Sequence, residues 1–199
     1  MTRGRVEAFS DGVIAIAITV MVLEMKVPRG GDWAALREVG PVFLSYVLSF
    51  IYLGIYWSNH HHLFQAVNRV SGAILWANLH LLFWLSLIPF VTGWMGENGF
   101  ARLPVALYGV VLMMAAIAYF ILTLALRRHR ENDTELSRAL RSEFKEKVSV
   151  ILYVMAVGLA YFSAWAACAI YVAVAIIWLV PDKRIERALA SSAEQTETA

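Results

Sequence analysis

Residues 5–23 read RVEAFSDGVIAIAITVMVL. From Val13 to Leu23 the stretch is apolar apart from Thr19, and an Arg, a Ser and an Asp precede it. A helix over residues 5–26 is long enough to cross a bilayer, which takes about 20 mostly apolar residues. Polar groups in such a helix are costly unless they pair with one another or face water. The sequence therefore predicts a first membrane helix that does more than anchor the chain.

The composition of the whole chain agrees with a membrane protein. Of its 199 residues 60% are hydrophobic and 16% are charged, and the mean hydropathy is +0.62. Soluble domains have about 45–50% apolar and about 25% charged residues. We therefore expect an all-α polytopic membrane protein with no large soluble domain. Hydropathy predicts six transmembrane helices, at residues 5–26, 41–66, 71–95, 102–126, 145–162 and 164–181.

Three features define the predicted boundaries. Pro41 is expected at the start of the second helix, because a helix tolerates proline in its first turn. Pro89 lacks a backbone donor and is expected to kink the third helix. The stretch 148–180 holds 33 uncharged residues, so we expect two compact helices with a turn near residues 161–164.

Lys and Arg residues indicate the orientation, since cytoplasmic loops carry an excess of them. Six spans place 13 of the 17 Lys and Arg residues on the side that holds both termini, which is therefore expected to be cytoplasmic. Residues 1–182 are expected to form one six-helix domain. Residues 127–147 are expected to include a solvated helix that extends the fifth span, and residues 183–199 a disordered tail.

The second and third helices carry polar residues at the depth of Ser10 and Asp11. Trp57 and His60 are three residues apart and share a helix face, and Asn78 lies near the start of the third helix. A histidine beside Asp11 would satisfy both groups at a low-dielectric site. The sequence therefore predicts an inter-helix polar network around the first helix.

Other chemistry is poorly supported. His60, His61 and His62 are consecutive, so their side chains point about 100° apart and do not converge on one metal ion. The roles of His61, His62 and His80 stay open. Ser10 and Asp11 diverge on their helix, with no oxyanion hole beside them, so we expect no enzyme. The basic stretch 127–147 lacks interleaved aromatic residues, so we expect no nucleic-acid partner.

The apolar part of the first helix allows two interpretations. Ile16, Val20 and Leu23 form one stripe with i, i+4, i+7 spacing, and Thr19 borders it. If several copies surrounded an axis, the stripe would form apolar rings with one ring of hydroxyls, and such rings gate by dewetting. Otherwise the stripe is an ordinary packing face.

The segment Arg5-x-x-x-Phe9-Ser10-Asp11 and the following GVIAIAIT resemble the first-helix signature of a known family. It is the endolysosomal potassium channel family, of the transmembrane protein 175 type, in its single-repeat prokaryotic form. Trp57-x-x-His60 with Leu63-Phe64, and Asn78 with Pro89-Phe90, resemble the family's second and third helices. The similarity is specific from Arg5 to Leu23 and only topological from Arg102 onward.

The resemblance implies a homotetramer in which the first helix of each subunit lines a central pore. The position of Ile16 supplies the narrow apolar constriction, and Val20 and Leu23 match further pore-facing positions. The position of Thr19 supplies a hydroxyl ring linked to potassium preference. The motif residues are implied to be structural, holding the pore helices through a polar network: Arg5, Phe9, Ser10, Asp11, Trp57, His60 and Asn78.

We therefore expect a potassium-preferring cation channel in a bacterial inner membrane, without a carbonyl filter. Its partners would be the lipid bilayer and three further copies, and its permeant potassium ion would be the sole small ligand, with no cofactor and no bound metal. Potassium sheds water more cheaply than sodium, so an apolar neck slightly favours it. The alternative is a proton-coupled secondary transporter that uses Asp11 and His60 as a relay.

Overall fold

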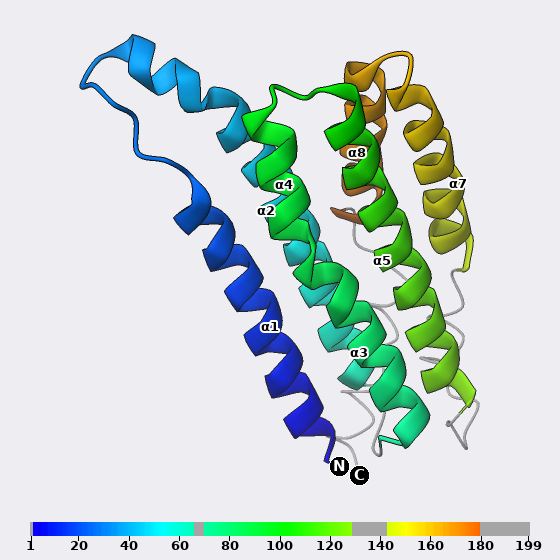
Figure 1. Ribbon diagram of the computed structural model, residues 1–199. Coiled ribbons are helices and arrows are strands. Elements are labelled where there is room, and N and C mark those ends of the chain that lie inside the picture. Colours follow the sequence, from blue (N-terminus) through cyan, green and yellow to red (C-terminus); the bar gives the residue numbers. More distant parts are fainter. Residues whose placement is uncertain (1, 66–69, 129–142, 180–199) are drawn as a thin grey trace, which may run out of the picture.

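The computed structural model describes residues 2–65, 70–128 and 143–179 (Figure 1). Every regular element in these ranges is an α-helix, which confirms the all-α prediction for them. The helices are α1 (Arg3–Glu24), α2 (Trp33–Gln65), α3 (Gly72–Ser86), α4 (Ile88–Glu97), α5 (Arg102–Arg128), α7 (Glu143–Ala160) and α8 (Ala164–Leu179). They stand side by side, with α1 at one edge of the bundle and α7 at the other (Figure 1).

Four helical segments are long and apolar enough to cross a membrane. They are α1, α2, the α3–α4 pair and α5, and α8 is a shorter apolar helix. The prediction of a polytopic membrane protein is therefore confirmed. The six-span topology and the position of the termini stay predictions.

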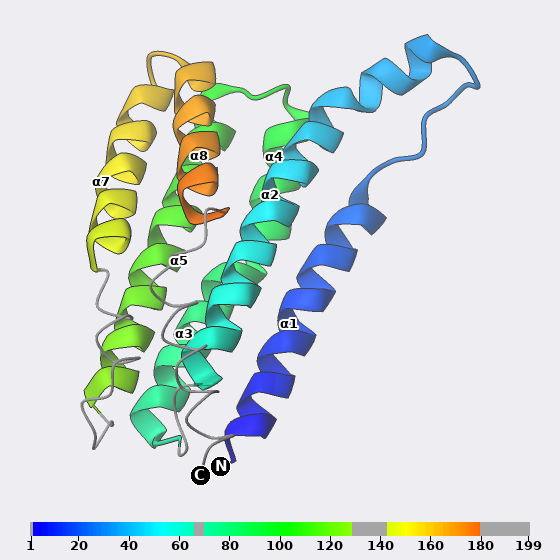
Figure 2. The ribbon, with the colours of Figure 1, turned by 180° about the vertical axis from the view of Figure 1, so that it is seen from behind.

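The start of α2 differs from the prediction. The helix begins at Trp33 and contains Pro41, which was expected at its first turn. The Asp32 carboxylate accepts a hydrogen bond of 2.9 Å from the backbone N–H of Ala35 and so caps the helix. The first turns of α2 project away from the bundle (Figure 2). Proline is tolerated there because the carbonyl that it leaves unpaired is not enclosed by other helices.

The kink predicted at Pro89 is present as a break between two helices. α3 ends at Ser86, and α4 begins at Ile88 with Pro89 in its first turn. The break lets the two halves face different neighbours: α3 packs chiefly on α5, whereas α4 packs on α2 and on α5.

The last two helices agree with the sequence prediction. α7 ends at Ala160 and α8 begins at Ala164, so the turn lies at the predicted residues. The Ser163 hydroxyl accepts a hydrogen bond of 3.4 Å from the backbone N–H of Ala166. The predicted cytoplasmic helix lies largely, and the predicted tail 183–199 wholly, outside the described residues.

Hydroxyl groups join the helices inside the bundle. Tyr153 of α7 donates to the Tyr52 hydroxyl of α2 at 3.2 Å, and Tyr52 donates to the backbone carbonyl of Tyr171 of α8 at 2.6 Å. The Tyr171 hydroxyl in turn donates to the carbonyl of Val105 of α5 at 3.1 Å. A Cβ atom on Gly109 would collide with the Tyr171 hydroxyl, so only glycine leaves room for this contact. These buried bonds fasten α7 and α8 to α2 and α5.

Candidate functional site

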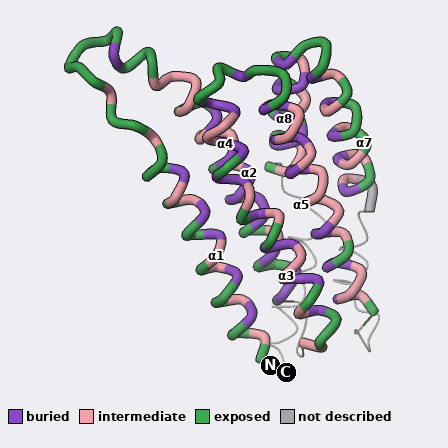
Figure 3. The backbone as a smooth tube through the Cα atoms, viewed as in Figure 1, coloured by how far each residue is buried: buried purple, intermediate pink, exposed green. Residues whose placement is uncertain are grey.

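Helix α1 has one face held by the bundle and one face left open. The buried stripe consists of Val6, Ser10, Ile14, Ala17 and Met21, which contact the other helices of the bundle. On the opposite side Phe9, Ile16 and Leu23 are 54%, 63% and 81% exposed. Buried and exposed residues therefore alternate along the tube of α1 in Figure 3, because the two faces lie on opposite sides of the helix. α1 thus has an apolar face that the other described residues of the chain leave uncovered.

The predicted pore-lining residues do not all lie on this open face. Ile16, Thr19 and Leu23 are exposed there, whereas Val20 is half-buried and flanks the face. Val22, which the helical wheel did not select, is 42% exposed and lies on the open side. The missed signal is a seven-residue spacing, because Ala8, Ala15 and Val22 run parallel to Phe9, Ile16 and Leu23.

The hydroxyl of Thr19 is bound to its own helix. Its Oγ1 donates a hydrogen bond that two backbone carbonyls share, at 3.1 Å to Ala15 and 2.9 Å to Ile16. A hydroxyl has one proton and two lone pairs. Because the proton is directed at the backbone, the oxygen presents lone pairs to the open face, which suits a cation.

Behind the open face, a chain of buried hydrogen bonds connects α1, α3 and α2. The Ser10 hydroxyl donates to the backbone carbonyl of Val6 at 2.8 Å and accepts from Nδ2 of Asn78 at 2.9 Å. Oδ1 of Asn78 lies 2.8 Å from Nε2 of His60. Ser10 and Asn78 are fully buried and His60 is nearly so. Three side chains from three helices are therefore linked by direct hydrogen bonds.

This geometry also determines the tautomer of His60. An amide oxygen only accepts, so a neutral His60 carries its proton on Nε2 and a lone pair on Nδ1. Nδ1 is buried and has no hydrogen-bond partner among the described residues, and the ring stacks on Phe64 with centroids 4.5 Å apart. The ring thus donates to Asn78 through Nε2.

Asp11 belongs to a separate contact. Its Oδ1 accepts a hydrogen bond of 3.0 Å from Nε1 of Trp57, so α1 and α2 meet here a second time. The expected bond between Asp11 and His60 is not formed, because Asn78 occupies the donor nitrogen of the histidine. The other two motif residues, Arg5 and Phe9, lie on the exposed side of α1 and take no part in these bonds.

A further polar group at the start of α1 was not foreseen. The Glu7 carboxylate forms an ion pair of 3.1 Å with Arg3 and lies 3.4 Å from Nδ1 of His61. His61 also contacts Gln65. The signal was the i, i+4 spacing of Arg3 and Glu7. Among the described residues, no three His, Cys, Asp or Glu side chains gather where a metal ion could bind.

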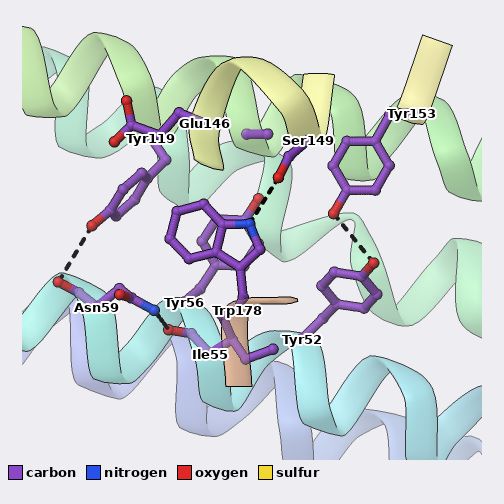
Figure 4. A pocket seen from close by; sticks show the side chains of 10 residues that line it. Tyr52, Ile55, Tyr56, Asn59, Tyr119, Glu146, Ser149, Tyr153 and Trp178 are labelled. Carbon is purple, nitrogen blue, oxygen red and sulfur yellow. Dashed lines mark hydrogen bonds between the residues drawn. The ribbon is translucent and has the colours of Figure 1, made fainter. Parts of the chain in front are cut away.

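A small, partly open pocket of about 30 Å³ lies between α2, α5, α7 and α8 (Figure 4). Trp178 donates to the Ser149 hydroxyl at 2.8 Å on one wall, and the Tyr119 hydroxyl points to the backbone carbonyl of Asn59 at 3.5 Å on another. The Glu146 side chain lines it as well. This volume holds a water molecule or two. The lining is mainly apolar and comes from these four helices, so α1 contributes nothing to it.

Comparison with known proteins places this arrangement in context. Residues 5–89 match the family described as the endosomal/lysosomal potassium channel TMEM175. A potassium channel of Chryseobacterium sp. (strain P1-3) is 57% identical over 189 residues, which cover 95% of this chain and 98% of that protein. The endosomal/lysosomal proton channel TMEM175 of Rattus norvegicus is 33% identical over 150 residues, covering 66% of this chain and 30% of that protein.

A solved structure is similar over nearly the whole chain. It is the crystal structure of a lysosomal potassium-selective channel TMEM175 homolog from Chamaesiphon minutus, with a TM-score of 0.78 and 31% sequence identity. The alignment covers 90% of this chain and 97% of that one.

Proposed function

Since the chain belongs to the TMEM175 family of ion channels, we propose that it forms a homotetrameric, potassium-preferring channel with α1 lining a central pore. The chain is a multi-pass membrane protein and not an enzyme. The proposed location is the inner membrane of a bacterium, and the pathway uses no cofactor besides the permeant ion.

The open face of α1 is the observation that carries this proposal. Ile16 and Leu23 project from the bundle, while the opposite face of α1 is held by the bundle. Copies arranged around an axis would turn these side chains toward one another as apolar rings, with Val20 at their border. A narrow apolar ring excludes ions until it is wetted, and it acts as a gate. Ile16 is therefore the proposed constriction.

The preference for potassium would arise from two weak effects. An ion in an apolar neck must shed part of its water, and potassium does so at lower cost than sodium. The Thr19 oxygen, with lone pairs on the open face, offers a replacement ligand next to that neck. Relatives in Chryseobacterium and Chamaesiphon are named potassium channels. Both effects are small, so we expect modest selectivity.

The proposed topology has six membrane spans with both termini in the cytoplasm. Besides the four long segments, α7 and α8 contain 18 and 16 residues. At about 1.5 Å per residue they are about 24–27 Å long, close to the hydrocarbon thickness of about 30 Å. The uncharged stretch 148–180, which takes in α7 beyond its charged first turns and all of α8, supports two further crossings, as does the distribution of Lys and Arg.

The alternative of a proton-coupled transporter receives less support. A relay requires Asp11 and His60 to exchange a proton, directly or through water. Here Asp11 accepts from Trp57, and His60 donates to Asn78, so the two groups are committed to different partners. The channel is therefore preferred.

The test is cation flux through the purified full-length protein in liposomes. With a potassium gradient we expect potassium efflux that exceeds sodium efflux under a matched gradient, and native mass spectrometry should show four copies. Equal rates for the two ions would contradict the potassium preference. Flux that requires a proton gradient would favour the transporter, and a stable monomer or dimer would contradict the tetramer.

A further inference from the structure

A groove of about 380 Å³ lies on the outside of the bundle, between α3 and α5. Each helix contributes residues with i, i+3, i+4, i+7 spacing, so one continuous face of each forms a wall. The residues that concern us are Ala73, Trp76 and His80 of α3 and Ile121, Leu124 and Arg128 of α5. None of them belongs to α1 or to the polar network behind it.

The described residues that line the groove include hydrogen-bond donors but no carboxylate. Arg128 is exposed, and among the described residues it forms neither a hydrogen bond nor an ion pair. The Trp76 side chain is 74% exposed, with its indole N–H available. Nε2 of His80 accepts from Trp84 at 3.0 Å, so a neutral His80 carries its proton on Nδ1 and offers that donor. The polar part of the groove thus suits an anion or an ester carbonyl.

The donors are also ordered by depth. α3 and α5 run antiparallel, so Ala73 and Trp76 at the start of α3 lie level with the end of α5 near Arg128 (Figure 1). His80 is one turn farther into the bundle, about 6 Å deeper. Ile121 and Leu124 line the groove beyond Arg128 in the same direction. This order matches the layers of a phospholipid. The cation and the indole lie at the level of a phosphate, the single donor at the level of an ester, and the apolar walls at the level of an acyl chain.

We propose that this groove binds an anionic phospholipid of the cytoplasmic leaflet. Arg128 and Trp76 bind the phosphate, His80 donates to an ester carbonyl, and the acyl chain lies against Ile121 and Leu124. Basic pockets between membrane helices on the cytoplasmic side are suited to such headgroups. The choice of leaflet rests on the orientation in the proposed function, but the binding itself needs no ion flux.

The test is native mass spectrometry of the purified full-length protein titrated with phosphatidylglycerol or phosphatidylcholine. We expect tighter binding of phosphatidylglycerol, and Arg128→Gln should weaken it about fivefold while affecting phosphatidylcholine little. Arg102→Gln is the matched control, because Arg102 begins the same helix at the opposite end. Ala73→Trp should fill the groove and lower the occupancy of both lipids.

Three outcomes would overturn the lipid site. One is equal affinity for the two lipids, another is an equal loss in the Arg128 and Arg102 variants, and the third is a changed number of subunits in Arg128→Gln, which would indicate that a second copy covers the groove. Circular dichroism establishes that each variant is folded. Absent potassium flux with intact lipid binding would refute the proposed function alone.

Discussion

At the scale of single residues, the sequence predicted which polar groups share a depth but not how they pair. Helical spacing placed Ser10, Asp11, His60 and Asn78 at one level, and the structure brings all four to the α1–α2–α3 contact. The partner of each was beyond reach, because a helical wheel gives the direction of a side chain and not the rotation of the neighbouring helix. His60 therefore donates to Asn78 and not to Asp11.

Asn78 is the middle residue of the buried hydrogen bonds, because it bonds to Ser10 of α1 and to His60 of α2. Replacement by leucine keeps the branched shape but removes the donor to the Ser10 oxygen and leaves the His60 N–H without its acceptor. Each unsatisfied group costs about 1–3 kcal/mol, so we expect Asn78→Leu to lower the melting temperature by several degrees in a thermal scan. Asn59→Leu is the control, because the Asn59 side chain bonds only to its own helix, at Ile55. Equal melting of the two variants would contradict the tether.

Thr19 offers a test of selectivity at one atom. Thr19→Val keeps the side-chain shape and removes the oxygen, so the preference for potassium over sodium should fall about two- to fivefold, as expected for one weak contact. The measurement is the reversal potential under biionic conditions. Thr123→Val is the control, because that hydroxyl is buried in α5 and bonded to the Tyr119 carbonyl. An unchanged reversal potential in Thr19→Val would exclude the hydroxyl from the selectivity mechanism.

At the scale of elements, a single glycine, Gly96, lets α4 approach α2 closely. A Cβ atom on Gly96 would lie 2.7 Å from Cα of Val42, a backbone atom that cannot rotate away. On the same helix, a Cβ on Gly93 would meet only Oε2 of Glu24 at 3.5 Å, an ordinary contact. Two glycines three residues apart therefore have different structural roles.

We expect Gly96→Ala to destabilise the protein by about 1–3 kcal/mol, because the methyl group must force the two helices apart. Gly93→Ala should leave stability unchanged or raise it slightly, since alanine favours a helix over glycine by about 1 kcal/mol. Thermal scans of the two purified variants make the comparison. A smaller loss in Gly96→Ala than in Gly93→Ala would contradict the packing at Val42.

The elements also show where sequence patterns sufficed. Pro89 and the uncharged stretch 148–180 predicted a break and a turn that the structure contains. Pro41 misled, because a proline within a helix and a proline at its start have the same local signature. Asp32, a residue type preferred at the N-cap, was the better signal for the start of α2.

At the scale of the whole molecule, the open face of α1 has meaning only in an assembly. One chain leaves Ile16 exposed, and the proposal requires the other copies to enclose it. Hydropathy could not reveal whether this face lines a pore, since the same apolar residue types face lipid and face an apolar pore. The family resemblance supplied the difference, and the exposure of Ile16 agrees with it.

Ile16→Asn tests whether Ile16 forms the constriction of the proposed pore. A polar ring at the constriction should hold water and raise potassium flux in liposomes severalfold. Ile151→Asn is the control, because Ile151 is 59% exposed but lies on α7 at the other edge of the bundle. Similar flux from the Ile16 variant and the parent protein would remove Ile16 from the constriction.

The inward hydrogen bond of Thr19 bears on the sign of the permeating charge. A hydroxyl whose O–H donates to a backbone carbonyl can accept a further hydrogen bond or bind a cation, but it has no second proton to donate. Four such oxygens around an axis would offer nothing to chloride, which needs donors. Discrimination against anions would then come from the direction of dipoles, without a fixed negative charge at that level of the membrane.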